Sequence, residues 1–167
     1  MHTIFPGSHG DFSHLNLPSI FLAGPSRRGE YEGQAHWRNE AIHLLRQMGF
    51  AGIIYSPEPM TEAYEKQVGW EDRRLNESTV IAFWVPRDLD ELPGFTTNVE
   101  FGEWMKSGKA VLGYPQGAPK MRYLHMKAEK YGIQIAHSLF DTMELAERMT
   151  RGLRGLFPQP TPEEATT

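Results

Sequence analysis

The segment Thr79-Val80-Ile81-Ala82-Phe83-Trp84-Val85-Pro86 is the most strand-prone run of the 167-residue sequence. β-branched and aromatic residues fill most of it, and such residues pack well on a buried pleated surface. No charged residue interrupts the run, and a proline ends it. We therefore expect a central strand that is buried on both faces, as in a parallel sheet covered by helices.

On both sides of this segment, short continuous apolar runs alternate with longer stretches in which apolar residues recur at helical spacing. The short runs predict strands at 20–25, 52–55, 110–114 and 134–136, and the others predict helices at 35–48, 61–76 (broken near Gly69), 96–107, 119–131 and 141–153. Strands that alternate with helices of about this length indicate right-handed βαβ units. The predicted fold is an α/β, three-layer α/β/α sandwich with a central parallel sheet of about five strands.

The two ends of the chain are expected to lie outside one folded domain at residues 19–156. Residues 1–18 are interpreted as an N-terminal extension with a short extended piece at 3–5. The tail at 157–167 contains three prolines, two glutamates and three threonines, and we predict that it is disordered.

The composition argues against several classes of function. A net charge of −4, without a basic block longer than a pair, argues against a nucleic acid polymer as partner. The absence of cysteine excludes disulfides and thiolate chemistry and suits a reducing cytoplasm. No apolar run approaches the ~20 residues that span a bilayer, and the N-terminus lacks the apolar core of a signal peptide. We therefore expect a soluble, cytoplasmic protein with no membrane partner.

The loop after the central strand leads into Thr96-Thr97-Asn98-Val99-Glu100-Phe101-Gly102-Glu103-Trp104, which contains the candidate nucleophile Glu100. Parallel α/β sheets bind ligands beyond the carboxyl ends of their strands, where this loop would meet the loops at 24–29 and 55–60. A carboxylate there can attack a sugar carbon. The alternative is structural, because Thr97 and Glu100 have the spacing of a helix capping box.

A second carboxylate, Glu71, is predicted near the same edge, preceded by Trp70. Two carboxyl groups suit the cleavage of an N-glycosidic bond through an oxocarbenium-like transition state. In the alternative interpretation, Trp70 anchors a helix to the core beside solvated acids. Trp70 and Tyr55 also offer aromatic surface for a base or sugar.

Two polar clusters have both a functional and a structural interpretation. Arg27 and Arg28 follow the first strand and could hold a 5′-phosphate, or they could be solvated loop residues. His36, Glu40 and His43 share one face of a helix, but this single cluster has no second copy and no cysteine partner. We therefore expect neither a metal nor a cofactor, and no dinucleotide or P-loop motif is present.

The order of several motifs resembles the nucleoside 2-deoxyribosyltransferase-like superfamily over about residues 19–146. The motifs are Phe21-Leu22-Ala23-Gly24, Trp37-Arg38-Asn39-Glu40, Gln67-Val68-Gly69-Trp70-Glu71, the central strand, Glu100-Phe101-Gly102-Glu103-Trp104 and Gly108-Lys109-Ala110-Val111. The resemblance implies that Glu100 is the nucleophile and forms a covalent deoxyribosyl intermediate, which a second base or water captures. It also implies a small-molecule nucleoside or nucleotide and a nucleobase as partners, and a homo-oligomer with sites near subunit contacts.

The chain departs from the superfamily at two aligned positions, and a further aspartate in the loop ahead of the nucleophile has no secure counterpart among Asp88, Asp90 and Glu91. Phe21 stands where classical members have a tyrosine, and Ser78 is the best match to an aspartate that precedes the third strand. We keep Ser78, Gly24 and Asn98 as candidate substrate-binding residues.

From these observations we predict a flavodoxin-like nucleoside 2-deoxyribosyltransferase that moves the sugar of a 2′-deoxynucleoside to another base. One alternative is an N-glycosidase that uses the same glutamate on a nucleoside or a nucleoside 5′-monophosphate. The other is a nucleotide-binding sensor without catalysis.

Overall fold

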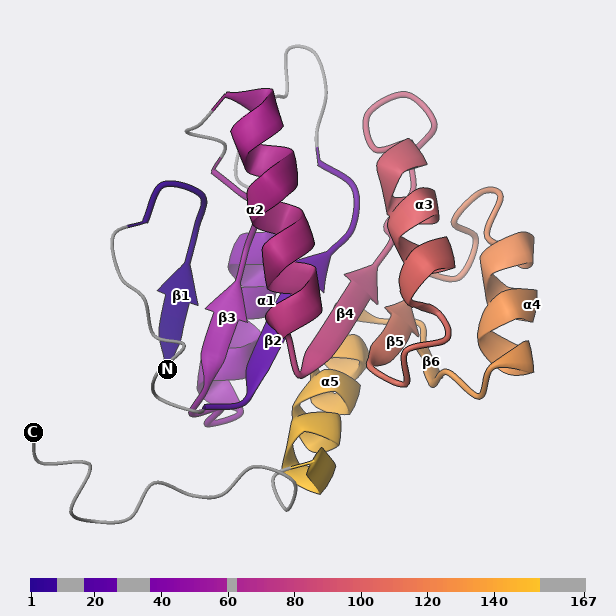
Figure 1. Cartoon of the computed structure of the whole chain (residues 1–167). Helices are drawn as coiled ribbons and strands as arrows, with labels where there is room; N and C mark the ends of the chain where they lie inside the picture. The colour runs from indigo at the N-terminus through magenta and orange to yellow at the C-terminus, as the bar shows by residue number, and fades with distance from the viewer. Residues whose placement is uncertain (9–16, 27–36, 60–62, 154–167) are drawn as a thin grey trace, which may run out of the picture.

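The computed structural model describes residues 1–8, 17–26, 37–59 and 63–153, and it has the predicted three-layer α/β/α architecture (Figure 1). Along the chain the elements are β1 (His2–Ile4), β2 (Ser19–Ala23), α1 (Trp37–Gln47), β3 (Ile53–Tyr55), α2 (Tyr64–Glu77), β4 (Val80–Trp84), α3 (Phe95–Trp104), β5 (Ala110–Gly113), α4 (Arg122–Lys130), β6 (Ile135–Ala136) and α5 (Leu139–Leu153). The helix predicted to break near Gly69 runs through that residue without interruption.

The described strands form one parallel sheet in the order β1-β3-β2-β4-β5-β6. Without β1, this is the order of flavodoxin-like sheets, in which the chain reverses its direction of winding between the first and third strands. In this protein those strands are β2 and β4, which are hydrogen-bonded neighbours. After β2 the chain continues to α1 on one face of the sheet, and after β4 it continues to α3 on the other face. The position between two such strands is called a topological switch point, and this class of fold binds ligands there.

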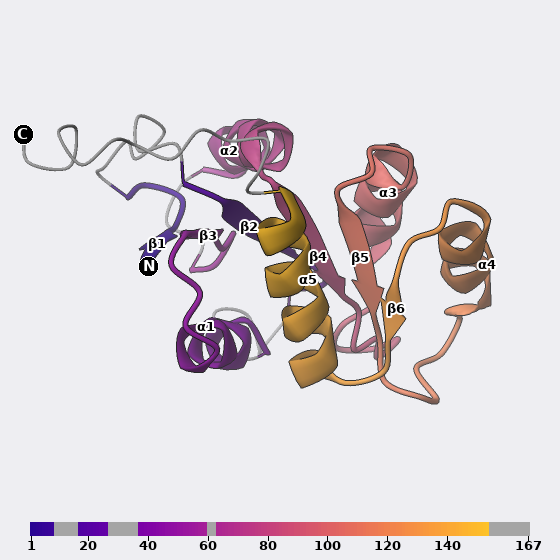
Figure 2. The same cartoon turned by 90° about the horizontal axis from the view of Figure 1, so that it is seen from below.

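Helices cover both faces of the sheet, as expected for strands without polar faces (Figure 2). On one face, α1 and α5 pack on the sheet through Leu45, Met143 and their apolar neighbours. On the other face, α2, α3 and α4 pack through Leu75, Phe101 and Leu124. All five residues of β4 are buried between these layers, which confirms the central strand predicted from 79–86.

The sheet has six strands, one more than about five, because His2–Ile4 pairs with β3 at the edge. The backbone amide of His2 donates to the carbonyl oxygen of Gly52 at 3.0 Å, and Ile4 is buried in the core. The extended piece predicted at 3–5 is thus the edge strand β1, which lies one residue earlier in the chain. The tail after residue 153 lies outside the described residues, and the domain boundaries stay a prediction.

The start of α3 differs from the predicted capping box. The helix begins at Phe95, and its N-cap is Gly94, which has the left-handed backbone angle φ 63° that glycine adopts without strain. Thr97 therefore lies within the first turn, where its buried hydroxyl makes no hydrogen bond among the described residues. Glu100 lies in the second turn, too far along the helix to cap it.

None of the helices in the described part of the chain is both long and apolar enough to cross a membrane.

Candidate active site

A cavity of about 760 Å³ opens at the carboxyl edge of the sheet, beside the switch point between β2 and β4. Its walls are the end of β2 with the loop that follows it, Arg38 of α1, Pro57 after β3, one face of α2, and α3 with the glycine before it. The lining residues are Phe21, Ala23, Gly24, Pro25, Ser26, Arg38, Pro57, Tyr64, Gln67, Val68, Glu71, Asp72, Leu75, Gly94, Phe95, Thr96, Val99, Glu100 and Glu103. The volume is in the range of small-molecule sites.

Glu100 lines this cavity from α3, as predicted for the ligand edge. Burial and, to a smaller extent, the neighbouring charges of Glu71, Asp72 and Glu103 raise the pKa of its carboxyl group to about 7, against the opposing effect of Arg38. A carboxyl group with this pKa is partly ionised at neutral pH and is held in a cavity wall. Such strongly shifted groups are concentrated at functional sites.

Glu71 lines the cavity from α2, which brings the two predicted carboxylates to one site. Gln67, one turn earlier, donates from Nε2 to Glu71 Oε1 at 2.8 Å and fixes the orientation of the carboxyl group. Burial raises the pKa of Glu71, whereas the Gln67 hydrogen bond and the charge of Arg38 lower it. Because the two glutamates repel each other when both are ionised, protonation of one favours ionisation of the other.

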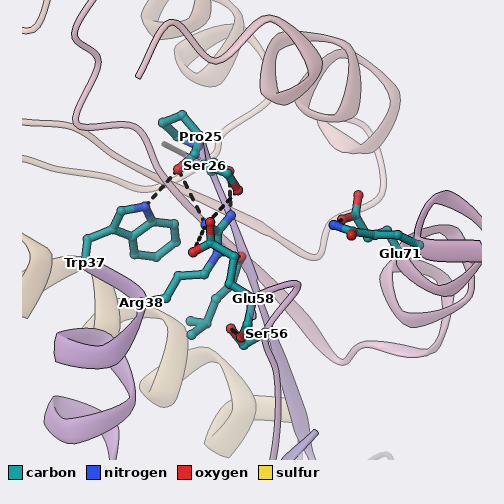
Figure 3. Close-up of polar contacts among 10 residues, drawn as sticks. Pro25, Ser26, Trp37, Arg38, Ser56, Glu58 and Glu71 are labelled. Atoms are coloured by element: carbon teal, nitrogen blue, oxygen red, sulfur yellow. Dashed lines mark hydrogen bonds and ion pairs between the residues drawn. The ribbon is translucent and has the colours of Figure 1, made fainter. Parts of the chain in front are cut away.

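Arg38 belongs to the motif Trp37-Arg38-Asn39-Glu40, but the sequence does not predict it as a site residue. Its side chain is only 3% exposed and enters the cavity wall from the first turn of α1. The guanidinium donates to the carbonyl oxygens of Leu22 at 3.2 Å and Gly24 at 2.6 Å, and it forms a 3.0 Å ion pair with Glu58. Figure 3 shows this group joining the loop after β2 to the loop after β3, with Glu71 pointing toward it from α2.

Gly24 has a structural reason to be glycine. Its φ of 153° is unfavourable for other residues, and a Cβ atom would lie 2.2 Å from the backbone oxygen of Trp84. Gly24 thus lets the ends of β2 and β4 approach each other closely beside the cavity. Arg27 and Arg28, the third and fourth residues after Gly24, lie outside the described residues.

The aromatic candidates Trp70 and Tyr55 pack below the cavity and are not among its lining residues. Trp70 contacts Phe21 and Tyr55 with ring centroids 6.2 and 6.4 Å apart, and Tyr55 is 3% exposed. They stabilise the apolar layer under α2. Phe21, at the position of the superfamily tyrosine, does line the cavity, so its wall has a ring without a hydroxyl group there.

Asn98 and Ser78 make contacts elsewhere. The Oδ1 atom of Asn98 accepts a hydrogen bond from Nη2 of Arg87. The other terminal nitrogen of Arg87, Nη1, donates to the carbonyl oxygen of Lys120 at 3.2 Å. This contact fastens α3 to the loops before α3 and α4. Ser78 is the C-cap residue of α2, and its hydroxyl donates to the carbonyl oxygen of Arg74 at the amino end of β4. The structure therefore places Ser78 at the opposite edge of the sheet from the cavity.

The described residues contain no group of three or more His, Asp or Glu side chains arranged to hold a metal ion. His36, one member of the predicted cluster, lies outside them, while Glu40 and His43 belong to α1.

Comparison with known protein families finds a match to this chain. The model of the family described as "Nucleoside 2-deoxyribosyltransferase like" matches residues 17–118, more than half of the chain. The match includes β2, Arg38, Glu71, β4 and Glu100. No curated protein matches the chain significantly. The chain belongs to the nucleoside 2-deoxyribosyltransferase-like family, whose members use nucleosides or nucleobases as small-molecule substrates and transfer or hydrolyse glycosyl groups.

Proposed function

We propose that this protein is a nucleoside 2-deoxyribosyltransferase in which Glu100 is the nucleophile. The observation that carries the proposal is the position of Glu100: in the wall of a cavity at the switch point, with a pKa raised to about 7 and with Glu71 close enough to influence it. Family membership supports the class of substrate.

The proposed reaction has two displacements at C1′ of the sugar. The ionised carboxylate of Glu100 attacks C1′ while the bond from C1′ to the base nitrogen breaks, and the bonding electrons leave with the base. The proton that the departing base needs comes from Glu71, whose raised pKa keeps it protonated more readily than an ordinary glutamate. A nitrogen of a second base then attacks C1′, the Glu71 carboxylate takes the proton of that nitrogen, and the bond from C1′ to Glu100 breaks, which releases Glu100 as a carboxylate. The two inversions give overall retention.

A direct assay tests this proposal against the alternatives. The protein is incubated with deoxyinosine or thymidine, with and without adenine, and the products are separated by chromatography. Formation of deoxyadenosine only when adenine is present would support transfer. Free base and free sugar without transfer would instead assign a hydrolase, in which water takes the place of the second base. Binding without any turnover would assign a sensor.

The rate is expected to fall as the pH drops below about 7. Glu100 attacks only when ionised, and burial holds its pKa at about 7, so kcat/KM should fall tenfold per pH unit well below that value. The measurement is the pH profile of kcat/KM. The substitution Asp72→Asn removes a charge that raises this pKa and should move the acid limb to lower pH.

Glu144→Gln provides the control for that profile, because Glu144 is exposed on α5, on the opposite face of the sheet. It should leave the acid limb unchanged. An acid limb near pH 4.5 in the wild-type protein, the ordinary value for a glutamate, would contradict the assignment.

We also propose that the protein assembles as a homo-oligomer whose subunits meet near the cavity mouth. Tyr64 and Val68 of α2 and Phe95 and Val99 of α3 line the cavity, yet 70%, 40%, 64% and 71% of their surfaces are exposed. Large exposed apolar side chains that cluster in this way are typical of interaction sites. Sedimentation equilibrium measures the assembly state, and a monomer at assay concentration would contradict this proposal.

A further inference from the structure

The wall of the cavity carries an excess of negative charge. Arg38 is the only base among its described lining residues, whereas four are acids: Glu71, Asp72, Glu100 and Glu103. The guanidinium of Arg38 is already engaged by Glu58 at 3.0 Å and by backbone carbonyl groups. Within the described part of the wall, no cation is therefore available to an anionic group of a ligand.

Two of these acids, Asp72 and Glu103, are exposed, and they lie on different walls of the cavity. Asp72 belongs to α2 and Glu103 to α3. The negative charge of each raises the pKa of Glu100, so their electric fields extend to the proposed reaction centre. Neither is assigned a role in the two displacements at C1′.

The segment at 27–36 lies outside the described residues, and its sequence is neutral overall. It contains Arg27 and Arg28, but also Glu30 and Glu32, so its formal charge is zero with histidine neutral.

We propose that Asp72 and Glu103 determine specificity by excluding 5′-phosphates, so that the substrate is an unphosphorylated nucleoside. This inference rests on the proposed function, because it concerns the same cavity. A 5′-phosphate carries nearly two negative charges above pH 7, and like charges brought together in a partly desolvated site oppose binding. The 5′-hydroxyl of a nucleoside carries no charge and can donate a hydrogen bond to a carboxylate.

The test compares thymidine with thymidine 5′-monophosphate as sugar donors, with adenine as acceptor, at pH 8. The measured quantity is the ratio of the two kcat/KM values within one variant, which cancels changes in the reactivity of Glu100. We expect the wild-type protein to prefer thymidine by at least about tenfold. The double variant Asp72→Asn/Glu103→Gln should narrow that ratio by about tenfold, and high salt should narrow it in the wild-type protein.

The matched control is Glu40→Gln/Glu144→Gln, which removes two exposed carboxylates from α1 and α5 on the other face of the sheet. Its ratio should equal that of the wild-type protein. A wild-type preference for the monophosphate, or an equal ratio in the cavity variant and the wild-type protein, would overturn the proposal. So would a selective loss of monophosphate turnover in Arg27→Gln/Arg28→Gln, which would assign phosphate binding to that loop.

If neither donor is turned over, the proposed function fails, and the same pair of ligands is compared by titration calorimetry. Binding of thymidine with at least tenfold weaker binding of its monophosphate would still uphold the charge-based exclusion. Comparable affinities, tighter binding of the monophosphate, or no binding of either ligand would overturn it.

Discussion

Replacing Glu100 by glutamine is expected to abolish turnover, with kcat/KM at least about 10³-fold lower, because a neutral amide cannot form the glycosyl ester on which both displacements depend. Glutamine keeps the size of the side chain in the cavity wall, so substrate should still bind. The measurements are the transfer rate by chromatography and the affinity for thymidine by calorimetry. Glu144→Gln, on the opposite face, is the control.

The stability of the same variant tests whether the loss of turnover is caused by unfolding. The folded state holds the proton of Glu100 more tightly than the unfolded chain, because burial raises the pKa from 4.5 to about 7. The wild-type protein therefore loses stability as the pH rises from about 4.5 to about 7. Glutamine cannot ionise, so at pH 8 the variant should be more stable by at most about 3 kcal/mol in urea unfolding. Normal turnover, or a variant less stable than the wild-type protein at pH 8, would contradict the assignment.

The fold could be predicted from the sequence because its signals are local and agree with one another. Buried parallel strands require continuous apolar runs, and 79–86 is such a run, so β4 was found where it lies. The edge strand β1 gives a weaker signal. It is three residues long, and its residue His2 is exposed, so only its pairing with β3 identifies it as part of the sheet.

The two cavity carboxylates were also predicted, but the reason for the position of Glu100 was not. The spacing from Thr97 to Glu100 matches a capping box, yet the chain enters α3 through Gly94 in a left-handed conformation. The helix therefore begins earlier than the motif suggests. Local spacing cannot reveal this, because the start depends on how the loop after β4 crosses the edge of the sheet.

Residues that interact only through the tertiary structure were the hardest to predict. Arg38 lies in an amphipathic helix in which a charged residue is ordinarily solvated, and its burial depends on carbonyl groups at the end of β2 and on Glu58 after β3. Ser78 was aligned with a site aspartate, but it caps α2 at the far edge of the sheet. Similarity of order along the chain does not state which edge of the sheet a residue occupies.

Replacing Arg38 by methionine is expected to destabilise the protein by about 3–5 kcal/mol, the usual cost of removing one partner from a buried ion pair. The side chain is 3% exposed, and its loss takes the donor from the Leu22 and Gly24 carbonyl groups and the ion pair from Glu58. Urea unfolding measures the change. Arg46→Met is the matched control, because Arg46 is exposed in the last turn of the same helix, and its loss should cost less than about 1 kcal/mol.

The same substitution distinguishes a role in the site from a role in folding alone. The charge of Arg38 lowers the pKa of Glu100, so its removal should raise that pKa and move the acid limb of kcat/KM to higher pH. Arg38→Lys keeps the charge but loses the forked donor geometry, so it should retain much of the wild-type pH profile while remaining less stable than the wild-type protein. An acid limb that stays in place in Arg38→Met would show that Arg38 holds the two loops together without tuning the nucleophile. A loss of stability no larger than that of Arg46→Met would contradict the structural role as well.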